Sequence, residues 1–259
     1  MATSVHPTAI LEPGALLDEG VEVGPYAFVG SEVHLGEGCV VHHHASIVGK
    51  TEVGRGNEFF PFASIGQKSQ DLKYKGEPTF LCIGAGNRFR EFVTINRATA
   101  VGGRTVIGSD NLFLAYAHVA HDCVIGDGCI FSNNATLAGH VLVGDYVTIG
   151  GLTAVHQFCR LGAHAMLGGC TKVVQDVPPF CLVDGNPARL RDLNRIGLKR
   201  RGLAKEALQS LKRAFRLLFE EGKNLSQGME ALEASGESTP EIAMLLAFLR
   251  APSERGVTR

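Results

Sequence analysis

The 259-residue sequence contains no tryptophan and only four tyrosines. It also lacks an apolar run of the about 18 residues that a membrane-spanning helix needs. Its first residues lack the basic stretch and the apolar stretch of a signal peptide. A formal net charge of −1 is not the broad basic excess that nucleic-acid binding requires. These absences predict a protein without a signal peptide, stable membrane insertion or a nucleic-acid partner.

The cysteines and glycines narrow the class of protein further. Seven cysteines, an odd number in a chain without an export signal, are expected to be reduced thiols in a cytoplasmic protein. The 32 glycines do not form G-X-Y triplets and come with only 10 prolines. This composition excludes collagen and predicts many tight turns.

Positive charge is concentrated in one segment near the C-terminus. Residues 189–223 carry 11 basic and 4 acidic side chains, whereas residues 1–188 carry 11 basic and 17 acidic side chains. The excess of seven positive charges (11 minus 4) predicts that this segment meets phosphate or an acidic partner.

A six-residue repeat covers about two thirds of the chain. In steps of six from Val5 to Val173, 27 of 29 positions are apolar, and only Asp71 and Glu77 break the series. The position two residues earlier is often alanine or cysteine, and glycine commonly follows the apolar residue. Because residues two apart face the same side of a strand, both restricted positions point inward. The cysteines among them are therefore predicted to be small core residues.

Three such hexapeptides form a triangular coil of 18 residues, and successive coils stack as parallel strands about 4.7–4.9 Å apart. Known proteins with this repeat form left-handed parallel β-helices, and the resemblance implies the same mainly β fold here. Two stretches, 67–79 and 98–104, interrupt the pattern. They are expected to be loops that leave the coils and contribute to binding.

The repeat stops at Asp176–Pro179, and a helical pattern follows. We expect two domains, a hexapeptide-repeat β-helix over residues 1–188 and a small α-helical domain over residues 189–259. Apolar residues at three- and four-residue spacings predict helices in the second domain, over 203–219, 225–234 and 240–250.

Two histidines and a carboxylate exceed what the repeat requires. His118, His121 and Asp122 lie close together in the sequence. The separations of His140 and His156 from His121 are within two residues of a multiple of the 18-residue coil, so these side chains are predicted to lie on the same edge. We expect the histidines to cluster within about 10 Å, given the strand spacing. Such a cluster serves either a zinc site, as in carbonic anhydrases on the same scaffold, or general-base catalysis. The carboxylate beside His121 favours the second chemistry, because it can orient the imidazole and stabilise its charged form.

Six motifs resemble the UDP-N-acetylglucosamine O-acyltransferase family of lipid A biosynthesis, and the similarity covers essentially the whole chain. They are A-H-V-A-H-D-C (117–123), N-N-A-T-L-A-G-H (133–140), G-G-L-T-A-V-H-Q-F-C (150–159), Q-D-L-K-Y-K-G-E-P-T (70–79), Q-D-V-P-P (175–179) and G-L-K-R-R-G (197–202). The resemblance implies transfer of a (R)-3-hydroxyacyl chain from acyl carrier protein to the 3-hydroxyl of UDP-N-acetylglucosamine. That reaction is the first step of lipid A biosynthesis. The resemblance also implies a homotrimer with active sites between subunits, and no metal or cofactor.

The resemblance assigns catalytic roles to three residues. His121 would be the general base, Asp122 its partner, and the backbone N–H of Gly139 the oxyanion donor. Further residues resemble those that bind the sugar nucleotide and the acyl chain, namely Gln70, Asp71, Lys73, His118, His140, His156, Gln157, Gly169, Asn194, Arg200 and Arg201. Asp71 and Lys73 would reach over from a neighbouring subunit, and Gly169 would leave room for a longer acyl chain.

Some positions depart from the family pattern. A glutamate that the family often has near the uridine is Ile196 here, and Lys172 and Pro187 differ near the acyl groove. These departures leave the acyl length and the uridine contact open, and the motifs also allow the 3-amino analogue of the sugar. The alternatives are the N-acyltransferase later in the pathway, which has an extra N-terminal domain, the zinc carbonic anhydrase, and a purely structural β-solenoid.

Overall fold

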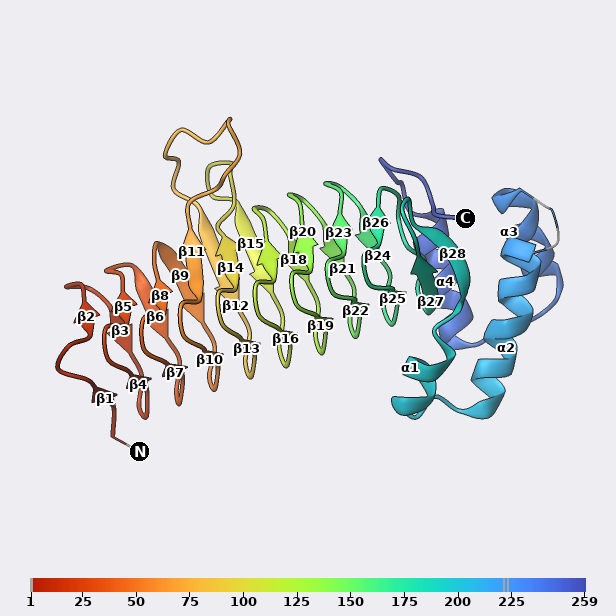
Figure 1. Ribbon diagram of the computed structural model, residues 1–259. Helices are drawn as coiled ribbons and strands as arrows, with labels where there is room; N and C mark the ends of the chain where they lie inside the picture. The colour runs from red at the N-terminus through yellow and green to blue at the C-terminus, as the bar shows by residue number, and fades with distance from the viewer. Residues whose placement is uncertain (1, 221, 223) are drawn as a thin grey trace.

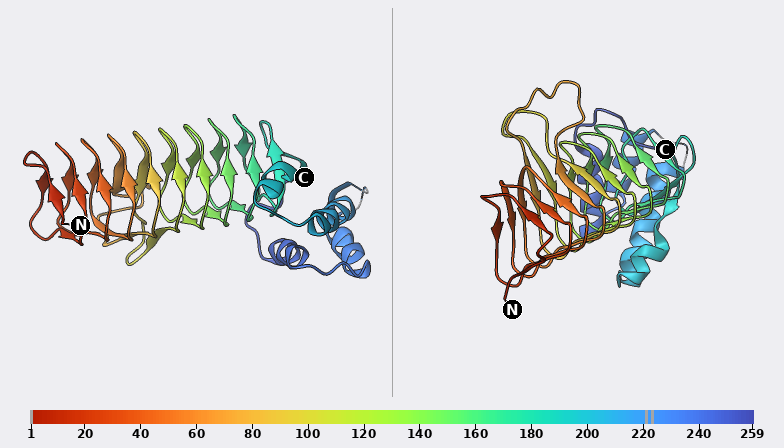
Figure 2. Two further views of the ribbon diagram at one scale, coloured as in Figure 1. Left: turned by 90° about the horizontal axis from the view of Figure 1, so that it is seen from below. Right: turned by 60° about the vertical axis from the view of Figure 1, so that its left-hand side comes forward.

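The computed structural model describes residues 2–220, 222 and 224–259. Within these residues the chain forms a long coil of short strands and ends in a group of helices (Figure 1). The strands belong to three sheets, which we name sheets A, B and C. In an oblique view the sheets form the three sides of a prism with a triangular cross-section (Figure 2).

Each sheet takes about every third strand of the chain. Sheet A contains β1 (Ser4–Val5), β4 (Glu22–Val23), β7 (Val40–Val41), β10 (Glu58–Phe59), β13 (Arg88–Phe89), β16 (Leu112–Phe113), β19 (Ile130–Phe131), β22 (Thr148–Ile149), β25 (Met166–Leu167), β27 (Cys181–Asp184) and β28 (Arg189–Leu193). Sheet B contains β2 (Ile10–Leu11), β5 (Phe28–Val29), β8 (Ser46–Ile47), β11 (Ser64–Gln67), β14 (Thr94–Asn96), β17 (His118–Val119), β20 (Thr136–Leu137), β23 (Ala154–Val155) and β26 (Lys172–Val173). Sheet C contains β3 (Leu16–Leu17), β6 (Val33–Leu35), β9 (Lys50–Val53), β12 (Phe80–Ile83), β15 (Arg104–Ile107), β18 (Val124–Ile125), β21 (Leu142–Val143) and β24 (Arg160–Leu161).

Successive coils stack in parallel register. His118 pairs with Thr136, and Thr136 pairs with Ala154, so each step along sheet B advances 18 residues. This register confirms the predicted left-handed parallel β-helix of hexapeptide repeats. The antiparallel pair of β27 and β28 ends sheet A next to the helices.

The turns between the sheets line up as three edges, which we call the AB, BC and CA edges after the sheets that they join. A residue in the turn often has a left-handed backbone. Examples are Tyr116 on the AB edge, Asp122 on the BC edge and Gly128 on the CA edge, with φ of 64°, 60° and 63°. Because the coils are stacked, turn residues 18 positions apart lie next to each other on one edge.

Inward-facing side chains form continuous columns that hold the coils together. The rings of Phe59, Phe89, Phe113 and Phe131 stack with centroids 5.0, 5.0 and 4.6 Å apart, and all four are fully buried. The seven cysteines are all free thiols, and Cys39, Cys123, Cys129, Cys159 and Cys181 are buried. The inward cysteines therefore have the core role that the repeat predicts.

The six-residue phase continues through two insertions because of their lengths. Paired residues are 18 apart for Ile47 and Ile65, but 30 apart for Ile65 and Ile95 and 24 apart for Ile95 and Val119. The insertions thus add 12 and 6 residues, two repeats and one repeat. Val101, which the apolar series includes, lies in the second insertion with 72% of its surface exposed. The apolar series counts Val101 because an insertion one repeat long keeps the phase, whereas the loop expected over 98–104 describes its place correctly.

Both insertions leave the BC edge. The long loop, residues 68–79, connects β11 to β12, and the short loop, residues 97–103, connects β14 to β15. The two loops stand out together above the coils in Figure 1. They agree with the predicted excursions within one residue at each end.

The C-terminal part contains α1 (Arg195–Arg200), α2 (Lys205–Phe215), a π-helical turn η1 (Arg216–Glu220), α3 (Leu225–Ala234) and α4 (Pro240–Arg250). The sequence predicts all of these except α1. A second apolar cluster joins the helices to Phe180, Cys181 and Leu193 of the β-helix end. The division into domains at residue 188 stays a prediction. No helix in the described part of the chain is long and apolar enough to cross a membrane.

Buried asparagines form a second column. Asn87 donates from Nδ2 to Oδ1 of Asn57 at 2.9 Å and to the carbonyl of Gly108 at 3.0 Å. Its Oδ1 accepts the backbone N–H of Asn111 at 2.9 Å. Each amide therefore satisfies polar backbone atoms of the next coil.

We expect Asn87→Ala to lower the free energy of unfolding by about 3 kcal/mol, because it leaves the buried carbonyl of Gly108 and the buried N–H of Asn111 without partners. Thermal unfolding followed by circular dichroism measures this loss. Asn133→Ala, on an exposed turn, is the matched control and should change stability by less than about 0.5 kcal/mol. Equal melting temperatures for the two variants would contradict the role of the column.

Candidate active site

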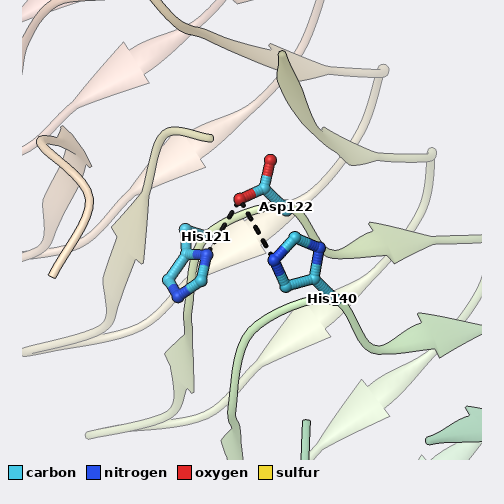
Figure 3. A group of neighbouring side chains, drawn as sticks. All are labelled: His121, Asp122 and His140. Carbon is cyan, nitrogen blue, oxygen red and sulfur yellow. Dashed lines mark hydrogen bonds and ion pairs between the residues drawn. The ribbon is translucent and has the colours of Figure 1, made fainter. Parts of the chain in front are cut away.

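The candidate active site lies on the BC edge, in the turn between β17 and β18. Asp122 takes the left-handed position of this turn, with φ of 60°. Aspartate tolerates that conformation better than most residues other than glycine. In Figure 3 its carboxylate points toward the rings of His121 and His140.

His121 and Asp122 form a tight hydrogen-bonded pair. Nδ1 of His121 lies 2.8 Å from Oδ2 of Asp122, and the side chains are only 12% and 14% exposed. A carboxylate oxygen accepts, so Nδ1 of His121 carries the proton in this pair. The neutral imidazole then has its lone pair on Nε2, the nitrogen that a general base needs.

Neighbouring backbone and hydroxyl groups fix the position of Asp122. The backbone N–H of Thr99 in the short loop donates to Oδ2 of Asp122 at 3.1 Å. The N–H of Asp122 itself donates to Oγ1 of Thr105 at 2.9 Å. The sequence gives no direct signal for Thr99, because the repeat leaves the path of an insertion undefined. Thr105 is an inward residue of β15, where the repeat predicts burial but not this contact.

Gly139 lies against the ring of His121. A Cβ atom at this position would come within 2.4 Å of Cε1 and 2.6 Å of Nε2 of His121, so a side chain would displace the ring. Gly139 is buried, and among the described residues its N–H has no hydrogen-bond acceptor. The lone pair of His121 and an unused N–H donor are thus close together in one buried place.

His140 is the next residue along the BC edge after Asp122. Its Nε2 lies 3.7 Å from Oδ2 of Asp122, and its ring is perpendicular to that of His121 at a centroid distance of 5.2 Å. On its other side it stacks on Phe158 at 4.8 Å. The stacked coils therefore bring His121, Asp122 and His140 together from two turns.

Of the other two histidines, His118 interacts with His121 and His156 is farther along the β-helix. His118, on β17, shares a hydrogen bond of 2.7 Å between its Nδ1 and Oγ1 of Thr94. Burial, and then the neighbouring His121, lower the pKa of His118, so its ring is held neutral. His156 lies two coils beyond Ala120, exposed, with Nδ1 3.1 Å from the carbonyl of the equally exposed Gln157.

The long loop carries Gln70, Asp71 and Lys73. Asp71 folds back on the loop itself, since its Oδ1 accepts the N–H of Lys73 at 2.8 Å. The side chains of Gln70 and Lys73 are exposed, and Leu72 between them is fully exposed. Within the described residues the loop binds the short loop and not the His121 ring, so its tip is available to another molecule.

The predicted nucleotide-binding residues lie elsewhere, at the CA edge. Asn194 caps α1 by accepting the N–H of Gly197 at 3.1 Å and donates to the carbonyl of His164 at 3.0 Å. The Arg201 guanidinium lies 4.3 Å over the ring of Tyr146, and Arg200 is exposed. One chain does not bring these groups to His121, because they belong to different edges of the prism.

Gly169 is near the AB edge, next to Cys170, which has a left-handed backbone. It is exposed, and the nearest atom to a Cβ built there is the carbonyl oxygen of Gly151 at 3.4 Å. A methyl group would therefore fit at Gly169 in ordinary van der Waals contact, and the position is not part of the turn that holds His121.

The grouping of His121, Asp122 and His140 is also the one that could hold a metal ion, since one ligand atom from each lies within 4.8 Å of the others. The hydrogen bonds that Asp122 accepts favour proton positioning over metal binding. Oδ2 of Asp122 already accepts from His121 and from the Thr99 N–H. These two bonds use Oδ2 of Asp122 and Nδ1 of His121 for proton positioning, the arrangement that general-base catalysis needs.

The fold and the site together define a hexapeptide-repeat transferase. A family model for bacterial transferase hexapeptides, six repeats long, matches residues 104–139. A second model, described as UDP N-acetylglucosamine O-acyltransferase, domain 2, matches residues 176–258.

Solved structures identify the particular family. LpxA from Acinetobacter baumannii is 41% identical, with a TM-score of 0.93, over 98% of this chain and 99% of that chain. UDP-N-acetylglucosamine O-acyltransferase from Moraxella catarrhalis is 40% identical, with a TM-score of 0.93, over 98% and 99%. The Arabidopsis enzyme is 36% identical, with a TM-score of 0.87, over 98% and 100%. The chain belongs to the UDP-N-acetylglucosamine O-acyltransferase family and is an enzyme.

Removal of divalent metals should leave acyl transfer unchanged, because the carboxylate of Asp122 serves as a hydrogen-bond acceptor in the site. Activity after dialysis against EDTA, together with the zinc content of the purified protein, measures this. If activity is lost after dialysis and added zinc restores it, the general-base hypothesis is contradicted and the zinc-site hypothesis is favoured.

Proposed function

We propose that this enzyme transfers a (R)-3-hydroxyacyl group from acyl carrier protein to the 3-hydroxyl of UDP-N-acetylglucosamine, the first step of lipid A biosynthesis. The observation that carries the proposal is the His121–Asp122 pair with the unused N–H of Gly139 beside it. Membership of the family supports the sugar nucleotide as acceptor. A cytoplasmic location stays a prediction.

The reaction needs one proton to move twice. Nε2 of His121 takes the proton of the sugar 3-hydroxyl while the oxygen attacks the thioester carbon, and the carbonyl oxygen becomes an oxyanion. The Gly139 N–H donates to that oxyanion. When the C–S bond breaks, the proton passes from His121 to the leaving thiolate. Asp122 stabilises the imidazolium that exists between the two transfers.

Two copies of the chain are needed to complete the site in this proposal. The base is on the BC edge, whereas Asn194, Arg200 and Arg201 are at the CA edge, and the tip of the long loop projects away. Packing the BC edge of one copy near another copy brings these groups together. His140, His156 and Gln157 would contact the sugar nucleotide and the acyl group.

The AB edge supports association of the chain into a homotrimer. Tyr26, Phe62, Phe92 and Tyr116 occupy left-handed turn positions there, with φ between 57° and 64°. These bulky residues are 60%, 46%, 40% and 54% exposed. At the CA edge, glycine takes the same conformation in the first coils, for example at Gly38 and Gly56, and Tyr146 and His164 take it near the helices. An aromatic side chain in this conformation costs about 1 kcal/mol or more, so its retention at an exposed edge favours contact with other copies.

Two features bear on the substrates. The basic segment 189–223 suits an acidic carrier protein, which positive charge attracts and orients. The absence of a side chain at the exposed Gly169 suits a longer acyl chain. Ile196, where the family often has a glutamate, is 68% exposed and adds no polar contact for the uridine.

We expect His121→Ala to remain folded and to lose at least about 10³-fold in kcat, because the proton acceptor is gone. Product formation from 3-hydroxyacyl carrier protein and UDP-N-acetylglucosamine, followed by mass spectrometry, measures the loss. His6→Ala, an exposed histidine on the first coil, is the control and should keep full activity. Turnover of His121→Ala close to that of the control would rule out the general-base role.

A site shared between copies predicts complementation. Asp71→Ala and His121→Ala should each be inactive alone, whereas chains refolded as a random mixture should recover about one quarter of wild-type activity. In a closed threefold ring each mixed trimer has one site with both residues intact. Activity of the mixture as a function of mixing ratio measures this. No recovery in mixtures that form mixed trimers would place Asp71 and His121 of the same chain in one site.

A further inference from the structure

The two loops on the BC edge bind each other through a pair of hydroxyl groups, one buried and one partly buried. Oγ of Ser69 in the long loop lies 2.7 Å from Oγ1 of Thr99 in the short loop, and Ser69 is only 5% exposed. A second contact lies farther along, where the N–H of Gly102 donates to the carbonyl of Pro78 at 2.9 Å. The long loop is therefore held by the short loop.

The short loop in turn lies on the carboxylate of Asp122. The Thr99 N–H donates to Oδ2, the same oxygen that accepts from His121. A Cβ atom at Gly103 would lie 3.4 Å from Oδ1 of Asp122 and 2.9 Å from the carbonyl oxygen of Ala100. Thr99 thus touches Asp122 with its backbone and Ser69 with its side chain.

Ser69 also shapes the start of the long loop. Its Oγ accepts the N–H of Asp71 at 3.1 Å, and Oδ1 of Asp71 accepts the N–H of Lys73 at 2.8 Å. A continuous set of hydrogen bonds therefore runs from His121 through Asp122, Thr99 and Ser69 to Asp71.

We propose that Ser69 and Thr99 are positioning residues that fix the long loop, and with it Asp71, for binding of the sugar nucleotide. The inference rests on the proposed function, in which Asp71 of one copy serves the site of the next. The Ser69–Thr99 bond then ties the catalytic carboxylate of one site to the loop that completes the neighbouring site. Neither residue touches substrate.

Three variants of the full-length protein test the proposal. Thr99→Val and Ser69→Ala each remove the hydroxyl bond, and each should raise KM for UDP-N-acetylglucosamine about tenfold. In Thr99→Val the backbone N–H to Asp122 remains, so kcat and its pH profile should stay within about twofold of wild type. Thr99→Ser keeps the hydroxyl and should restore the wild-type KM.

The double variant and a matched control separate positioning from general destabilisation. Ser69→Ala with Thr99→Val should raise KM no further than Ser69→Ala alone, since Ser69→Ala already removes the bond between the hydroxyls together with the acceptor of the Asp71 N–H. Ser210→Ala deletes another buried hydroxyl, which bonds to Glu237 among the helices, and should leave KM unchanged. Unchanged KM in both single variants would overturn the proposal, as would a raised KM that Thr99→Ser does not restore. Inactivity of His121→Ala would still stand in that case, so the two failures are distinguishable.

Discussion

The parallel register between coils is the constraint on which the fold and the candidate site depend. It places residues 18 positions apart next to each other, so that Phe113 stacks on Phe131 inside and Asp122 lies beside His140 at the edge. The hydrogen bonds that hold the register belong to the backbone and need no particular side chain. The edges are therefore free to carry chemistry without loss of the core.

The same geometry separates the functional groups. An edge position has a fixed direction relative to the prism, so residues on the BC and CA edges of one chain face different ways. In the proposed function, His121 is the base and meets the basic groups near Arg201 because another copy supplies one of the two. The long loop extends the reach of the BC edge, and Leu72 at its tip is left fully exposed. Catalysis and assembly are linked by this arrangement.

Much of the fold follows from the sequence, because the six-residue period defines both strand spacing and inward positions. Val101 shows what the period alone misses, since an insertion as long as one repeat keeps the phase and only the glycine-rich composition of 98–104 indicates the loop. In the site, the 18-residue coil places His140 beside Asp122, but it cannot place the contact from Thr99, which depends on the path of a loop. It also cannot show that Arg200 and Arg201 lie at another edge, because α1 leaves the repeat.

The central claim is that Asp122 holds His121 as the tautomer with its proton on Nδ1 and its lone pair on Nε2. Nitrogen-15 NMR of histidine-labelled protein, recorded at a pH at which the imidazole is neutral, tests this claim most directly. Comparison with His121→Asn assigns the His121 signals. The account predicts a protonated Nδ1 and an unprotonated Nε2 in the wild type, and loss of that preference in Asp122→Asn. A proton on Nε2 in the wild type would contradict it.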